Sequence, residues 1–246
     1  MLKRWLHIEL FVIAVAMAGG MCAAKGEQTE MKQQTHTFET QVVRTVKLNY
    51  LLHLPKNLAE KEKWPLILFL HGAGERGDDV AKVRAHGIPK IVEKQDDFPF
   101  ITVSPQCASR SWWTMEVEAL NALLDDIVAK YPVDQKRIYL TGLSMGGYGT
   151  WQLAAEYPER FAAIAPICGG GEHEKASRLK DIPAWVFHGA KDTVVKPEES
   201  EKMVDVLKAV GGNVKYTLYP DANHDSWTET YDNPALYAWF LSHARK

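Results

Sequence analysis

The chain of 246 residues lacks the patterns that mark metal-binding, nucleic-acid-binding and membrane-spanning proteins. It has three cysteines, no paired C-x-x-C spacing, no H-E-x-x-H and no EF-hand pattern, so no metal site is predicted. The formal net charge is −2 with both signs interspersed, which argues against a nucleic-acid-binding surface. No apolar run approaches the roughly 20 residues that span a bilayer. A small neutral or weakly charged partner is therefore expected.

The N-terminal residues have the order of a secretory signal peptide. Lys3 and Arg4 precede an apolar run from Leu10 to Ala18, and small residues follow as far as Ala24. This order predicts a signal peptide over 1–24 and an exported protein, secreted or periplasmic, without stable membrane insertion after signal removal. The letters GGMC, which end at Cys22, leave a lipid anchor on that cysteine as the alternative.

Residues 25–37 are polar and nearly free of large apolar groups, which predicts a flexible leader before a single domain over 38–246. After removal of 1–24, the remaining cysteines are Cys107 and Cys168. In an oxidising compartment they could form a disulfide, but two buried free thiols are an equal alternative.

Short apolar segments alternate with amphipathic ones along the rest of the chain. Residues 41–54 alternate with period two and predict two antiparallel strands. Six apolar runs predict further strands: 65–71, 99–104, 137–142, 161–168, 184–189 and 213–219. The clearest helix is expected over 115–131, with Pro132 just beyond it. The pattern predicts an α/β fold with a mostly parallel eight-stranded sheet and helices on both faces. Ligands then belong at the carboxyl ends of the strands.

The passage 137–158 carries the most specific motif. An apolar strand runs through G-L-S-M-G into a predicted helix, which is the context required of a nucleophile elbow centred on Ser144. The strand and helix approach each other closely at such a turn, so the positions two before and two after the serine have little room. Gly142 and Gly146 fill these positions.

A serine nucleophile needs a base and a group that orients the base. Asp192 and His224 each follow one of the last two predicted strands, and the order Ser144, Asp192, His224 is that of α/β-hydrolases. Among the alternatives, Asp221 and Asp225 flank the histidine too closely to orient its ring. Structural roles are also expected for three further residues: His71, Asp134 and His188.

The glycines of LFLHGAGERGDD raise the question of a dinucleotide-binding loop, because Gly72, Gly74 and Gly77 have the spacing G-x-G-x-x-G. Such a loop would require an acidic residue at the end of the next strand, and that strand ends in Ser104 and Pro105 instead. We expect the loop to supply an oxyanion donor, the N–H of Ala73 or, as the alternative, of Gly74. The second donor would be the N–H of Met145. A charge network formed by Glu75, Arg76 and Asp78 is expected to pin this loop.

Together the motifs HGAGERGDD, SPQC, SWW, GLSMGGYGTW, APICGGG and HGAKDTVV resemble the α/β-hydrolase superfamily from about residue 40 to 246. They are similar to carboxylesterases of the dienelactone hydrolase-like, feruloyl and acetylxylan esterase, and polyhydroxybutyrate depolymerase-like groups. The resemblance implies hydrolysis of carboxylic esters through an acyl-enzyme without a cofactor. Dienelactone hydrolases themselves use a cysteine nucleophile, so Ser144 argues against the dienelactone substrate.

The sequence gives weaker signals about substrate specificity than about the catalytic residues. Trp112, Trp113 and Trp227 are candidates for an aromatic substrate pocket, and core packing is the alternative for each. Only 169–183 separates two strands where a lid could be inserted, which predicts an open site suited to esters on polymers such as acetylated or feruloylated polysaccharide. A prolyl oligopeptidase-like peptidase and a catalytically silent binding protein are the alternative functions. The sequence leaves the oligomeric state open.

Overall fold

The computed structural model describes residues 35–41, 43–95 and 97–246. Residues 44–246 form one compact unit. The described residues before this unit, 35–41 and 43, are exposed and include neither helix nor strand. The predicted signal peptide and most of the predicted leader lie outside the described residues. Within the part of the chain that the structure describes, no helix is long and apolar enough to cross a membrane.

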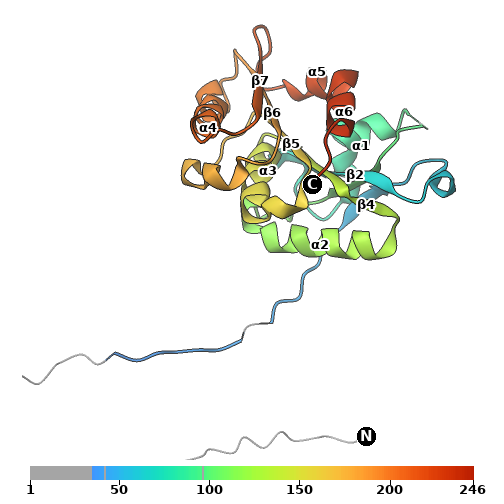
Figure 1. The fold of residues 1–246 in the computed structure, drawn as a ribbon, viewed down its shortest axis with the longest axis horizontal. Coiled ribbons are helices and arrows are strands. Elements are labelled where there is room, and N and C mark those ends of the chain that lie inside the picture. The colour runs from blue at the N-terminus through green and yellow to red at the C-terminus, as the bar shows by residue number, and fades with distance from the viewer. Residues whose placement is uncertain (1–34, 42, 96) are drawn as a thin grey trace, which may run out of the picture. The chain divides into compact units, whose positions relative to one another are not determined.

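A seven-stranded sheet in the order β1-β3-β2-β4-β5-β6-β7 forms the centre of this unit (Figure 1). Strand β1 is antiparallel to β3, and every other neighbouring pair is parallel. The strands are β1 (Tyr50–His53), β2 (Trp64–Leu70), β3 (Ile101–Pro105), β4 (Val133–Leu143), β5 (Ala163–Ile167), β6 (Ala184–Gly189) and β7 (Val214–Tyr219). The predicted α/β-hydrolase fold with a mostly parallel sheet is confirmed.

The predicted number of eight strands is wrong for the described residues. The six later strands form near their predicted positions, but only β1 forms from the segment predicted to contain two. Residues 44–49 precede β1 without strand structure, although Leu48 packs against the core. Alternation of apolar residues indicates which side chains face the protein, but it does not indicate whether a partner strand is present.

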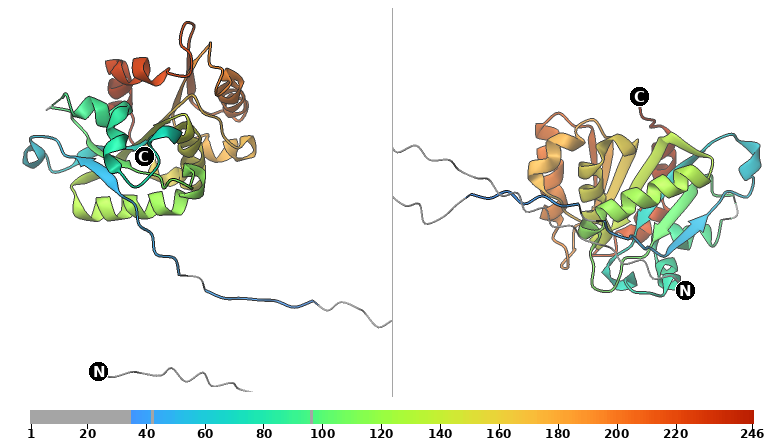
Figure 2. Two further views of the ribbon diagram at one scale, coloured as in Figure 1. Left: turned by 180° about the vertical axis from the view of Figure 1, so that it is seen from behind. Right: turned by 90° about the horizontal axis from the view of Figure 1, so that it is seen from below.

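In the described part of the chain, six α-helices cover the two faces of the sheet (Figure 2). They are α1 (Gly87–Val92), α2 (Val117–Lys130), α3 (Met145–Glu156), α4 (Pro197–Ala209), α5 (Trp227–Asp232) and α6 (Pro234–Leu241). Apolar residues of α2, α3 and α4 pack in one core cluster, and those of α1, α5 and α6 pack in the other. The predicted helix over 115–131 is confirmed as α2.

Strand β2 shows how one sequence run serves both cores, because all seven of its residues are buried. Leu66, Leu68 and Leu70 belong to the cluster that contains α2, α3 and α4. Ile67 and Phe69 belong to the cluster on the opposite face. Successive side chains of a strand point to opposite faces, so a central strand covered on both sides is apolar throughout. This arrangement leaves the loops at the carboxyl ends of the strands available for polar residues.

Candidate active site

Ser144 occupies a sharp turn between the end of β4 and the start of α3. Its backbone has φ 54° and ψ −115°, a conformation that costs free energy for a residue with a side chain. The turn is fixed by a 2.9 Å hydrogen bond from the N–H of Ser144 to the carbonyl of Ile167. A Cβ atom on Gly142 would overlap the backbone of Gly146, and one on Gly146 would overlap the carbonyl of Leu70. The steric reason predicted for both glycines is confirmed.

The structure brings the three predicted catalytic residues into one hydrogen-bonded chain. Nδ1 of His224 lies 2.7 Å from Oδ2 of Asp192, and Nε2 of His224 lies 3.0 Å from Oγ of Ser144. Asp192 follows β6 and His224 lies in the loop after β7, so the carboxyl ends of separate strands supply the three side chains. Because the carboxylate accepts from Nδ1, the Nε2 lone pair faces the serine hydroxyl.

The surroundings of Asp192 favour its ionised form. Its side chain is buried, and its Oδ1 accepts hydrogen bonds from the N–H groups of Val194 at 2.8 Å and Val195 at 3.0 Å. Burial raises the pKa of Asp192, but the hydrogen bonds from His224, Val194 and Val195 outweigh burial and hold the pKa below its ordinary value. The alternative acid, Asp221, is exposed and pairs with Lys191 at 2.7 Å.

The loop after β2 is held by hydrogen bonds to its own carbonyl groups. Nδ1 of His71 donates to the carbonyl of Gly72 at 2.6 Å, and the N–H of Cys107 donates to Nε2 of the same ring at 3.0 Å. The indole of Trp113 donates to the carbonyl of His71 at 2.9 Å. Burial lowers the pKa of His71 to about 4, more than its bond to Gly72 raises it, so the ring is neutral near pH 7. The neutral ring carries its proton on Nδ1, as these two bonds require.

Two further side chains complete this bracing. Nε2 of Gln106 donates to the carbonyls of Glu75 and Asp79, each at 2.8 Å, and Nε of Arg76 donates to the carbonyl of Ala73 at 3.1 Å. The predicted charge network of Glu75, Arg76 and Asp78 is wrong for the described residues: Glu75 lies 3.9 Å from His71 and His86, and Arg76 bonds to backbone carbonyls instead of carboxylates. Sequence analysis missed Gln106, whose signal was weak: a polar residue directly after a buried strand, next to Cys107.

The amides of Ala73 and Met145 form no hydrogen bond with another described residue. Ala73 begins a 3₁₀ turn (Ala73–Glu75), and Met145 begins α3. The first N–H groups of a helical turn have no partner within it, so both donors are free to bind an oxygen of a ligand.

The three candidate pocket tryptophans have different environments. Trp113 is completely buried and packs in the core against Gly149 of α3, so its assignment to the pocket is wrong. Trp112 is 48% exposed, and the guanidinium of Arg76 lies 4.7 Å from its ring centroid. Trp227 is partly buried and meets His224 edge to face, with ring centroids 5.2 Å apart. Adjacent aromatic residues in a loop can point in opposite directions, which the sequence alone does not reveal.

Cys107 and Cys168 are buried free thiols, so no disulfide joins them. The side chains of Cys168, Asp192 and His224 form the single group among the described residues whose ligand atoms, all within 4.8 Å of one another, could hold a metal ion. Burial raises the pKa of the Cys168 thiol well above its ordinary value, which keeps it protonated. Because Asp192 and His224 already bind each other, the group fits a hydrogen-bonded chain better than a metal site.

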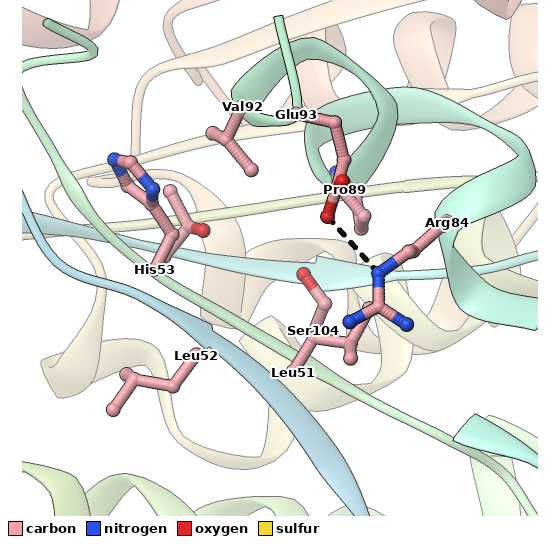
Figure 3. A pocket seen from close by; sticks show the side chains of 9 residues that line it. Leu51, Leu52, His53, Arg84, Pro89, Val92, Glu93 and Ser104 are labelled. Carbon is pink, nitrogen blue, oxygen red and sulfur yellow. Dashed lines mark hydrogen bonds and ion pairs between the residues drawn. The ribbon is translucent and has the colours of Figure 1, made fainter. Parts of the chain in front are cut away.

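A pocket of about 290 Å³ lies elsewhere in the molecule, between β1, β3 and the segment that includes α1 (Figure 3). Its residues include Ser104 and the ion pair of Arg84 with Glu93, whose Nε and Oε1 atoms are 3.0 Å apart. None of the candidate active-site residues lines this pocket.

Comparison with known proteins identifies the family. The model of the dienelactone hydrolase family matches residues 88–237, which is more than half of the chain and includes Ser144, Asp192 and His224. The chain belongs to the dienelactone hydrolase family. Within this family, the resemblance to esterases inferred from the motifs is confirmed.

Several known proteins are similar to this family member. The bifunctional acetylxylan esterase/xylanase XynS20E of Neocallimastix patriciarum is 27% identical and aligns with 76% of this chain and 27% of its own. Poly(3-hydroxyalkanoate) depolymerase C of Paucimonas lemoignei is 28% identical over 47% of this chain and 38% of its own. The crystal structure of a thermostable esterase superposes with a TM-score of 0.71 at 38% identity, covering 81% of this chain and 60% of that one. The alignments thus cover from about a quarter to about three fifths of these relatives.

Proposed function

We propose that this member of the dienelactone hydrolase family is a serine esterase that hydrolyses carboxylic esters through an acyl-enzyme. The observation that carries the proposal is the hydrogen-bonded chain from Ser144 through His224 to Asp192, with the serine held in a strained elbow. Such a chain turns a hydroxyl group, which is a weak nucleophile, into one that attacks as its proton leaves.

In this mechanism, Oγ of Ser144 attacks the ester carbonyl while Nε2 of His224 takes the hydroxyl proton. Asp192 holds the ring in the required tautomer and stabilises the positive charge that develops on it. The N–H groups of Ala73 and Met145 donate to the oxyanion of the tetrahedral intermediate. His224 then gives its proton to the leaving alcohol. A water molecule, activated by the same histidine, releases the acid and restores Ser144.

For the substrate, we propose acetyl or feruloyl esters displayed on polysaccharide. Two relatives support this class by their names: the acetylxylan esterase/xylanase of Neocallimastix patriciarum and the protein described as probable feruloyl esterase C of Aspergillus terreus, which is 24% identical over 59% of this chain. The exposed ring of Trp112, which Arg76 contacts near the loop of Ala73, offers a surface for a sugar or aromatic acyl group.

We also propose that the protein is exported, secreted or periplasmic. The order of charged, apolar and small residues in 1–24 supports export. A relative from Arthroderma benhamiae, 25% identical over 79% of this chain, is described as an uncharacterized secreted protein. An esterase acting on polysaccharide would meet its substrate outside the cell.

The test compares the chain lacking residues 1–24 with its Ser144→Ala variant. Ser242→Ala is the matched control, because Ser242 is exposed at the end of α6. We expect hydrolysis of p-nitrophenyl acetate by the wild type and the control, and none by Ser144→Ala despite an unchanged circular dichroism spectrum. Full activity of Ser144→Ala would reject the elbow as the source of the nucleophile.

After p-nitrophenyl acetate, three further substrates are tested: methyl ferulate, an acetylated xylan and an acylated dipeptide. Preference for one of the first two supports the polysaccharide ester class. Turnover of the dipeptide alone would favour a peptidase. A folded wild type that is silent on every substrate would favour a binding protein of this fold.

A further inference from the structure

A second histidine lies behind the proposed catalytic acid. His188 belongs to β6, precedes Asp192 by four residues and is completely buried. Its Nε2 lies 3.2 Å from Oδ2 of Asp192, the same oxygen that accepts a hydrogen bond from His224. One carboxylate oxygen is therefore placed between two imidazole rings.

The partners of His188 determine where its protons are. Nε2 faces Oδ2 of Asp192 and, at 3.0 Å, the carbonyl oxygen of Val195. An ionised carboxylate and a carbonyl can only accept, so Nε2 must carry a hydrogen. On the other side of the ring, Nδ1 lies 2.7 Å from Oγ of Ser200. This hydroxyl has one hydrogen, which it donates to the carbonyl of Gly169 at 2.9 Å.

Nδ1 must then donate to Oγ of Ser200, and both ring nitrogens of His188 carry hydrogens. A neutral ring would need the hydroxyl hydrogen to turn towards Nδ1. That rotation would leave the Ser200 oxygen facing the carbonyl oxygen of Gly169 without a hydrogen between them, and a buried carbonyl without its donor costs free energy. The positively charged ring satisfies every polar atom in this group.

We propose that His188 is a buried imidazolium that pairs with Asp192 and thereby lowers the affinity of His224 for a proton. The inference deepens the proposed function and rests on it. A buried cation is stable only when it is paired, and the carboxylate of Asp192 provides the pairing. When His224 is also protonated, one carboxylate must serve two cations. In the free enzyme, His224 therefore remains unprotonated, and able to act as a base, down to a lower pH than it would in an Asp–His pair without His188.

Other titratable groups also face this site. Cys168 follows β5, and burial raises the pKa of its thiol, so it is uncharged. Tyr148 on α3 is uncharged as well, because burial and the neighbouring Glu199 of α4 raise its pKa. Glu199 and Asp225 are acidic neighbours of Tyr148 and Cys168, and their negative charges are opposite in sign to the charge proposed for His188. The nearby cation Lys191 is exposed and paired with Asp221.

His188→Gln tests the charge, because glutamine can still donate to Asp192 but carries no positive charge. The measurement is kcat/KM against pH for p-nitrophenyl acetate with the purified full chain, at a wavelength where p-nitrophenol and its anion absorb equally. Nε2 of His188 and Nδ1 of His224 lie 3.2 Å and 2.7 Å from the same oxygen, so they are at most the sum of these two distances, about 5.9 Å, apart. At an effective dielectric constant of about 20, two like charges this close move a titration by about one to two pH units. We expect the acidic limb of the His188→Gln profile to lie about one to two units higher than that of the wild type.

Ser200→Ala provides an independent variant, since it removes the acceptor of Nδ1 and favours the neutral ring. Its acidic limb should also move to higher pH. His173→Gln is the matched control, because His173 is exposed on the 3₁₀ segment His173–Leu179, and its profile should follow the wild type. If both variants keep the acidic limb of the kcat/KM profile at the wild-type pH and show only a lower maximum kcat/KM, His188 is a neutral structural residue. That result would overturn the proposal.

Nuclear magnetic resonance of the protein labelled with ¹⁵N-histidine tests the proton count without any turnover. We expect two protected N–H signals that disappear in His188→Gln, and a single one would overturn the proposal. A folded wild type with two such signals but no esterase activity would reject the proposed function and leave the charge of His188 established. The two failures can therefore be distinguished.

Discussion

His71 donates a 2.6 Å hydrogen bond from Nδ1 to the carbonyl oxygen of Gly72, the other end of the peptide group whose N–H belongs to Ala73. This contact fixes the direction of the amide that we propose as an oxyanion donor. The N–H of Cys107, which donates to Nε2, holds the neutral ring in the required tautomer. Protonation of His71 would replace the acceptor on Nε2 with a donor and break that contact.

The neutral state of His71 should make stability depend on pH. The pKa of His71 is about 4 in the folded protein because of burial, against 6.5 ordinarily, so the unfolded chain binds the extra proton first. Its contribution to stability is complete above pH 6.5 and is lost as the pH falls towards 4, by roughly 2 to 3 kcal/mol. Urea unfolding at pH 7 and pH 4.5 should show a smaller loss for His71→Gln than for the wild type. Equal losses in the two proteins would contradict the lowered pKa, and the exposed His173→Gln should behave as the wild type.

Asp192→Asn should reduce kcat by roughly 10³- to 10⁴-fold, because an amide does not hold the His224 ring in the tautomer that accepts the serine proton. Ester hydrolysis at pH 8 measures the effect. Asp221→Asn is the matched control, since Asp221 is exposed and bonded to Lys191, and should retain full activity. Loss of activity in Asp221→Asn, with activity retained in Asp192→Asn, would identify Asp221 as the catalytic acid.

Gly146→Ala should prevent folding or destabilise the protein by about 4 kcal/mol or more, because the added methyl group would overlap the carbonyl of Leu70. Thermal or urea unfolding measures the change. Gly74→Ala is the control, since nothing lies within 4 Å of a Cβ atom at that position. A stable, folded Gly146→Ala protein would show that β4 and α3 separate more easily than this close contact implies.

Trp113→Ala and Trp112→Ala should separate packing from substrate binding. Removal of the buried Trp113 ring should lower the free energy of unfolding by about 3 to 5 kcal/mol. Removal of the exposed Trp112 ring should change stability little and raise KM for methyl ferulate with a smaller change in kcat. An unchanged KM for Trp112→Ala would remove this residue from the proposed substrate surface.

The local sequence was sufficient to predict much of the fold and the candidate site. The apolar runs located the six parallel strands, because strands covered on both faces must be apolar throughout. The elbow was predictable because the close approach of β4 and α3 permits only glycine at positions 142 and 146. Asp192 and His224 were predictable because polar residues after buried parallel strands meet at one edge of the sheet.

Only the tertiary structure decided which residues support that site. The contacts of His188 with Ser200, of Gln106 with the loop after β2, and of Trp113 with His71 join segments with no shared sequence pattern. The same holds for the two free thiols and for the second N-terminal strand, which does not form among the described residues, because both depend on which segments lie next to each other. Sequence patterns record whether a side chain is buried and how sharply the backbone turns, whereas the protonation state of a buried histidine depends on donors and acceptors that only folding brings together.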